Sequence, residues 1–212
     1  PVFAIVVIGV SSRRTIGIIA TIAVIAGIEL STAWISSCQC GAAAAEPAVA
    51  GDSARRVLQD GLSLELAPLP HEQTRAFLVA RGFPEADARW AAERGCFFRS
   101  AIANSASAVN APSIDIALGA WRVTAAGAAT GKPPLTREGW EGEWRARAVG
   151  EAAAVAFHWA LFPTAQTFAP TDHNWGFLTF DLPAGTRFAL DIVWRVDGRE
   201  ATARIDDLEC AR

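Results

Sequence analysis

The sequence predicts a mainly β protein with an N-terminal membrane helix, in which an antiparallel β-sandwich is preceded by a helical hairpin. Three observations predict this fold class. A long apolar run lies near the N-terminus, two helical segments that end at glycine follow it, and apolar residues then alternate with polar ones at a period of two. Because 51% of the residues are hydrophobic, the chain can bury a core, and disorder is excluded as its main state.

The apolar run over residues 16–36 contains one charged residue, Glu29. A helix of about 20 residues crosses the ~30 Å hydrocarbon layer, so we expect a transmembrane signal-anchor helix over residues 15–37. Trp34 lies near its far end, where an indole ring suits the lipid headgroups. A carboxylate inside the layer costs about 2.5 kcal/mol or more, so Glu29 either meets a membrane partner or sits close enough to the headgroups to reach them.

Residues 1–14 are expected to form a cytoplasmic flank. The sequence SRRTI, from Ser12 to Ile16, resembles the twin-arginine export signal of bacteria. Paired arginines also fit the positive flank that sets the orientation of any membrane anchor. Both interpretations predict a single-pass protein of the bacterial inner membrane with its C-terminal domain in the periplasm. The alternative is cleavage after an A-x-A sequence, for which residues 48–50 and residues 43–45 are the two candidates.

Residues 38–69 are rich in Ala, Gly and Pro and are expected to form a tether, with a short helix near residues 53–60. The exported domain is expected over residues 70–212. It begins with a helix that ends at Gly82 and a second helix that ends at Gly95, since glycine is favoured just beyond a helix C-terminus.

Six strand-length runs follow, separated by turn residues. Asp197-Gly198, between the last two, is a strong hairpin signal. Antiparallel strands at this spacing predict a β-sandwich of immunoglobulin-like type. The expected strands are residues 96–104, 113–124, 152–162, 176–182, 187–196 and 201–208.

The four cysteines predict an oxidising compartment, because all of them follow the expected membrane span. Cys96 opens the first expected strand and Cys210 follows the last, so we expect a structural disulfide between them. Cys38 and Cys40 form a C-x-C pair, which can hold a soft ion such as Cu(I), carry a lipid or form an intermolecular bridge.

Two histidines of the exported domain are candidate metal ligands. His158 is expected in a strand, and His173 is expected in a loop beside Asp172. Together these residues would hold copper or zinc if the strand end meets the loop. The alternative is a hydrogen-bonded strand histidine and a loop organised by the aspartate side chain. No cofactor is expected unless copper is bound.

Charge and motifs exclude other classes. The net charge is −3, from 19 basic and 22 acidic residues, which argues against nucleic acid as a partner. The chain has no G-x-S-x-G, phosphate-binding loop, G-x-G-x-x-G or H-E-x-x-H motif, so we do not expect an enzyme. A hydrolase or carbohydrate-active module is a third interpretation, but the sequence offers it no evident nucleophile or acid pair.

Aromatic residues in expected loops indicate an interaction surface. Trp140 and Trp144 lie in a polar stretch, and Phe168 and Trp175 lie in a long connection. Aromatic side chains on ordered loops are typical binding anchors. The alternative is that these rings cover the ends of the sandwich.

These observations lead to one expected function and one alternative. We expect a membrane-anchored periplasmic accessory or assembly subunit that docks its β-sandwich domain onto a larger membrane protein complex, with the lipid bilayer as its second partner. The alternative is a periplasmic copper- or metal-handling protein that uses Cys38 and Cys40 or His158 and His173.

Overall fold

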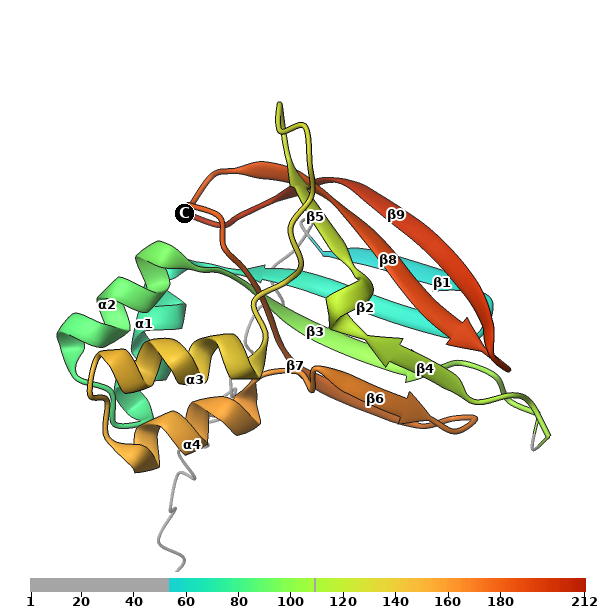
Figure 1. The fold of residues 1–212 in the computed structure, drawn as a ribbon, viewed down its shortest axis with the longest axis horizontal. Coiled ribbons are helices and arrows are strands. Elements are labelled where there is room, and N and C mark those ends of the chain that lie inside the picture. Colours follow the sequence, from blue (N-terminus) through green and yellow to red (C-terminus); the bar gives the residue numbers. More distant parts are fainter. Residues whose placement is uncertain (1–53, 109) are drawn as a thin grey trace, which may run out of the picture. The chain divides into compact units, whose positions relative to one another are not determined.

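The computed structural model describes residues 54–108 and 110–212, which form two antiparallel β-sheets and a group of helices. Figure 1 shows the four α-helices of the described residues gathered at one end of the sheets. The strands are β1 (Arg55–Gln59), β2 (Leu62–Leu69), β3 (Cys96–Asn104), β4 (Ile114–Ala117), β5 (Arg122–Ala125), β6 (Ala165–Phe168), β7 (His173–Phe180), β8 (Arg187–Val196) and β9 (Arg199–Glu209). The helices are α1 (His71–Ala80), α2 (Glu85–Arg94), the short 3-10 helix η1 (Leu118–Ala120), α3 (Arg137–Ala146) and α4 (Glu151–Ala160). The prediction of a mainly β protein with antiparallel sheets is confirmed.

The first sheet has the strand order β1-β2-β3-β7. In the second sheet, β8 pairs with β9, β4 and β5, and β6 pairs with β4. Strands β4 and β5 pair with successive parts of β8, because η1 interrupts the run over residues 113–124. That run is therefore two short strands and not the single strand that the sequence predicts.

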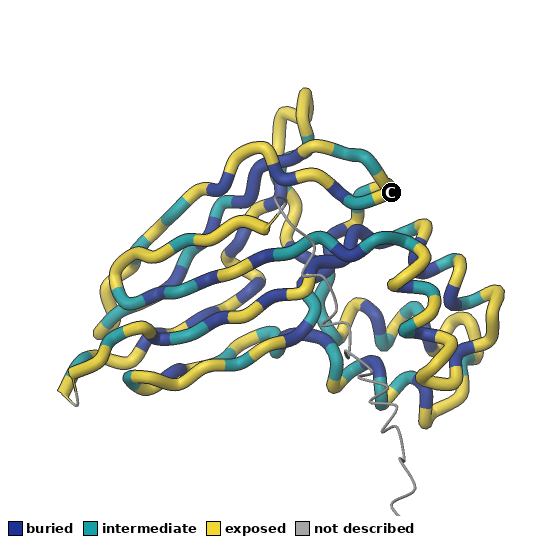
Figure 2. The backbone as a smooth tube through the Cα atoms, turned by 180° about the vertical axis from the view of Figure 1, so that it is seen from behind, coloured by how far each residue is buried: buried dark blue, intermediate teal, exposed yellow. Residues whose placement is uncertain are grey.

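One hydrophobic core is shared by the two sheets. Alternate residues of β2, namely Leu62, Leu64 and Leu66, are fully buried in it, and Trp194 of β8 packs in the same cluster. The resulting alternation of buried and exposed positions is visible along the strands in Figure 2. This is the period-two pattern expected of strands with one solvated face.

A second core lies among the helices. Trp140 and Trp144 of α3 stack with their ring centroids 5.0 Å apart, and Phe157 of α4 meets both rings edge to face at 5.4 Å. Phe97 of β3 belongs to the same cluster and joins the helices to the first sheet. The helices therefore form a packed layer with its own aromatic centre.

The structure contains the predicted disulfide and the predicted glycine turns. Cys96 and Cys210 form a disulfide with their Cα atoms 5.3 Å apart, which ties the start of β3 to the end of β9. Asp197 and Gly198 both have positive φ, as a two-residue hairpin turn requires. Gly82 has a φ of +88° just beyond α1, so its predicted role in ending that helix is confirmed.

Two regions differ from expectation. Residues 55–69, expected in the tether, form the β1–β2 hairpin around Asp60-Gly61, whose φ angles of 45° and 80° fit the same turn type. The prediction of a short helix near residues 53–60 is therefore wrong, because strand β1 occupies most of that range. Residues 152–162, expected as a strand, lie mostly in α4. The reason is that Ala153 and Phe157 are buried on one side at a spacing of four residues, which is the period of a helix.

The N-terminal predictions fall outside the described residues. These are the flank over residues 1–14, the signal-anchor helix over residues 15–37 and the part of the tether that precedes Ala54. Over residues 54–108 and 110–212, no helix is both long enough and apolar enough to cross a bilayer.

Candidate functional site

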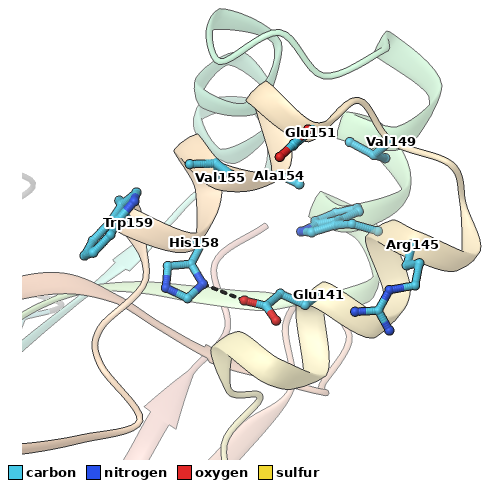
Figure 3. A pocket seen from close by; sticks show the side chains of 9 residues that line it. Glu141, Arg145, Val149, Glu151, Ala154, Val155, His158 and Trp159 are labelled. Atoms are coloured by element: carbon cyan, nitrogen blue, oxygen red, sulfur yellow. Dashed lines mark hydrogen bonds and ion pairs between the residues drawn. The ribbon is translucent and has the colours of Figure 1, made fainter.

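A hollow of about 650 Å³ lies beside α3 and α4. Figure 3 shows side chains of both helices and of the loop between them around it. We call it the α3–α4 hollow. It is lined by Glu141, Trp144, Arg145, Val149, Glu151, Ala154, Val155, His158 and Trp159.

Helix α3 has one side that faces the helical core and another that faces the hollow. The helix begins after Thr136, whose hydroxyl accepts a hydrogen bond from the backbone N–H of Gly139 at 3.4 Å. Trp140 and Trp144, four residues apart, point into the helical core and are only 1% and 2% exposed. Glu141, one residue after Trp140, lies about 100° further around the helix and reaches the hollow.

His158 and Glu141 form the main polar contact of the hollow. His158 Nδ1 lies 2.7 Å from Glu141 Oε1, and this bond joins α4 to α3 (Figure 3). A carboxylate that holds an imidazole in this way fixes its tautomer and orientation. The residues that line the hollow include no side-chain hydroxyl or thiol beside this pair.

Trp159 stands at the edge of the hollow with 72% of its surface exposed. The Arg137 guanidinium lies 5.6 Å from the centre of its ring, in a cation–π contact. Arg137 also donates hydrogen bonds to the carbonyl of Leu161, just beyond the end of α4. Partial burial lowers the pKa of Arg137 from its usual value.

The floor of the hollow is apolar and tightly packed. Trp144 lies between the rings of Phe83, Trp90 and Phe157 in edge-to-face contacts. Its indole Nε1 is buried and makes no hydrogen bond in the part of the chain that the structure describes. Trp144 therefore forms a rigid aromatic base for the hollow.

Glu138, in the first turn of α3, has its pKa lowered. The largest cause is the Thr164 hydroxyl, which donates a hydrogen bond shared between the two carboxylate oxygens at 2.7 and 3.0 Å. The ionised carboxylate is thus favoured by folding. Its contribution to stability is present above the ordinary pKa of about 4.3 and is lost as the pH falls through the lowered value.

We therefore expect Thr164→Val to destabilise the protein by about 0.5 kcal/mol at pH 7, a small effect because Glu138 is largely exposed to solvent. The difference from the wild type should shrink as the pH falls below the ordinary pKa of a glutamate, about 4.3, and through the lowered pKa of Glu138 in the wild type. Urea titrations at several pH values measure it. An equal difference at pH 3 and pH 7 would show that the hydroxyl does not act through Glu138.

Three of the aromatic residues expected at the surface are buried. Trp140 and Trp144 are part of the helical core, and Phe168 is 0% exposed in the core shared by the sheets. The prediction that they lie on exposed loops is wrong, because a helix and a strand direct them inward. Trp175 is 76% exposed on β7, so its predicted role as an interaction residue stays open.

The structure gives the two candidate metal histidines separate surroundings. His158 lies in α4 and not in a strand, and it is bonded to Glu141. His173 is the first residue of β7. The Asp172 carboxylate accepts a hydrogen bond from the backbone N–H of Ala169 at 3.0 Å, which organises the preceding turn.

The described residues, 54–108 and 110–212, hold no cluster of three or more His, Cys, Asp or Glu side chains that could bind a metal ion. The remaining predicted site residues, Glu29, Trp34, Cys38 and Cys40, lie outside the described part of the chain. The copper-handling alternative therefore gains no support from the described residues.

Sequence reasoning missed Glu141, Val155 and Trp159 as site residues. The signal that could have found them is the alanine-rich composition of residues 152–156, since alanine favours helix over strand. Comparisons with models of protein families, with curated proteins and with solved structures find no match to this chain.

Proposed function

We propose that this protein is a membrane-anchored periplasmic accessory or assembly subunit that docks onto a larger membrane protein complex. In this proposal the two sheets form an immunoglobulin-like β-sandwich, and the α3–α4 hollow is the docking surface. The observation that carries the proposal is the outward side of α4, where the apolar side chains of Val155 and Trp159 are 49% and 72% exposed.

Helix α4 is apolar on nearly all sides. Its ten residues include only two polar side chains, Glu151 and His158. A helix of this composition is normally buried all round, whereas the side of α4 that carries Val155 faces solvent. Since residues four apart lie on the same side of a helix, Val155 and Trp159 form one exposed apolar stripe beside the hollow. A partner that covers this stripe would complete the burial of α4.

The chemistry of the hollow indicates what such a partner presents. An apolar side chain from a partner helix fits between Val149 and Val155, which both line the hollow. The surrounding Glu141, Arg145 and Glu151 carry charges of both signs, which would fix the orientation of the partner. The expected membrane span further upstream supports a partner in the same membrane.

We expect Trp159→Arg to release the protein from its complex. A tryptophan that becomes buried as a binding hot spot contributes about 2 kcal/mol or more, which corresponds to roughly thirtyfold in Kd. The measurement is the size of the assembly that contains the full chain after extraction from the membrane with a mild detergent, for the wild type and for the variant.

Val79→Arg is the matched control, because Val79 is an exposed apolar residue on α1 that does not line the hollow. The control variant should remain in the complex. A wild-type chain that is extracted as a monomer, or a Trp159→Arg variant that stays in the complex as fully as the control, contradicts the proposed function.

A further inference from the structure

The outer face of the first sheet is a second surface with unusual composition. Arg56, Glu65, Ala101 and Trp175 are directly opposite one another on β1, β2, β3 and β7. Residues opposite one another in antiparallel strands share a face, and all four are exposed. We call this row and the neighbouring Arg99 the open face.

The open face contains a hollow of about 350 Å³. Its lining includes Ala67, Ala101 and Gly176, so small residues form the floor, while Trp175, Arg99 and Glu65 provide the larger side chains around it. This volume falls within the range of small-molecule sites, which is about 300–1,000 Å³.

The charged side chains of the open face have no bonding partners within the described residues. Arg56, Glu65 and Arg99 form no ion pair or hydrogen bond there, even though Arg56 is directly opposite Glu65. Other charged side chains do pair, since Arg204 on the second sheet lies 2.7 Å from Asp191 and 2.8 Å from Asp206. Within the described residues, the open face thus keeps both hydrogen-bond donors and acceptors free.

The ring of Trp175 is also free. In the described part of the chain it has no aromatic or cation–π contact, whereas Trp159 carries Arg137 over its ring. Neighbouring Asn174 holds the strand in place, since its Oδ1 accepts from the Trp175 backbone N–H at 2.8 Å and its Nδ2 donates to Gln166 at 2.7 Å. The open face therefore presents an uncovered aromatic ring on a fixed strand.

We infer that the open face is a saccharide-binding site. A sugar ring has one apolar face of C–H groups, which are attracted to the negative face of an indole ring. Its hydroxyl groups both donate and accept hydrogen bonds, and so need both kinds of partner. Glu65 can accept from them, and Arg99 and Arg56 can donate to them.

The spacing of the open face suits this ligand. Trp175 and Arg99 occupy diagonal positions on neighbouring strands, about 7–8 Å apart. Glu65 lies two strands from Trp175, about 10 Å away. A sugar ring stacked on Trp175 would thus have Arg99 at its edge, and a second ring would reach Glu65. A purely anionic ligand is less favoured, because Glu65 would repel it.

The test uses the full chain, purified in a detergent without a sugar headgroup so that the detergent does not compete. The probes are chitotetraose, cellotetraose, maltotetraose and trigalacturonate, and binding is followed by calorimetry and by the indole N–H signals in NMR spectra. We expect at least one probe to bind with a Kd of about 1 mM or tighter and to shift the Trp175 signal. Trp175→Ala should weaken this binding by about tenfold or more.

Trp159→Ala is the matched control, since it removes an exposed tryptophan from a different surface. It should leave the Kd unchanged. Failure of all four oligosaccharides to bind, or binding by Trp175→Ala equal to that of the wild type, overturns the inference. Trp175-dependent binding to phosphatidylglycerol vesicles but to none of the oligosaccharides also overturns it and identifies a lipid surface instead.

Discussion

Trp140→Ala should lower the free energy of unfolding by about 3–5 kcal/mol. Trp140 is buried at the centre of the helical core, where it stacks on Trp144 and meets Phe157 edge to face. Its Nε1 donates to the Thr179 hydroxyl at 2.8 Å, and that hydroxyl donates to the carbonyl of Leu135 at 3.1 Å. The substitution therefore opens a cavity and also removes the hydrogen bond that joins α3 to β7.

Trp159→Ala is the comparison for this prediction, because it makes the same chemical change at an exposed position. It should alter stability by no more than about 0.5 kcal/mol. Urea unfolding followed by circular dichroism measures both variants. If Trp140→Ala unfolds entirely, Trp140→Phe keeps a ring and loses the hydrogen bond, and should cost about 1–3 kcal/mol. Equal stabilities of the Trp140→Ala and Trp159→Ala variants would contradict the helical core as described.

Removal of the Cys96–Cys210 disulfide should cost about 2–5 kcal/mol. The two cysteines are 114 positions apart in the sequence, so the bond closes a long loop in the unfolded chain. Both residues are buried where β3 begins and β9 ends. A Cys96→Ala/Cys210→Ala variant should therefore unfold at a clearly lower urea concentration than the oxidised wild type.

The control for this experiment is a Cys38→Ser/Cys40→Ser variant, which leaves the disulfide in place. Its stability should match that of the wild type and should fall when a reductant is added during unfolding. The reductant should have no effect on the Cys96→Ala/Cys210→Ala variant. An oxidised wild type no more stable than the variant without the disulfide would show that this bond does not stabilise the fold.

Local signals predicted the strands well where they were unambiguous. In β8, buried Phe188, Leu190, Ile192 and Trp194 recur at every second residue, and Asp197-Gly198 then forces a hairpin into β9. The Cys96–Cys210 disulfide was also predicted, from the expected order of the strands and the expected oxidising compartment, and the structure contains it. The strand pattern and the turn depend on a few neighbouring residues, and the disulfide depends on one covalent bond. Packing against the rest of the protein therefore does not change them.

The helical layer was harder to predict, because periodicity alone does not separate a strand from a helix in a short apolar run. The alanine-rich composition of residues 152–156 favours a helix, and the contact of Phe157 with the two tryptophans of α3, which the sequence does not show, stabilises it. The burial of Phe168 and the exposure of Trp175 could not be predicted from the sequence either. Both residues lie in the connection that the sequence predicts as one long loop, yet strand pairing buries the first and exposes the second.

The proposed docking surface is tested most directly by a photo-reactive amino acid at position 159 of the full chain in its native membrane. A second variant carries the same group at position 202, on β9, as a control. We expect one discrete adduct with a membrane protein from position 159 and none from position 202. Val155→Arg in the same chain should abolish that adduct. The absence of an adduct from position 159, or the same adducts from both positions, would show that this surface does not dock onto a membrane protein.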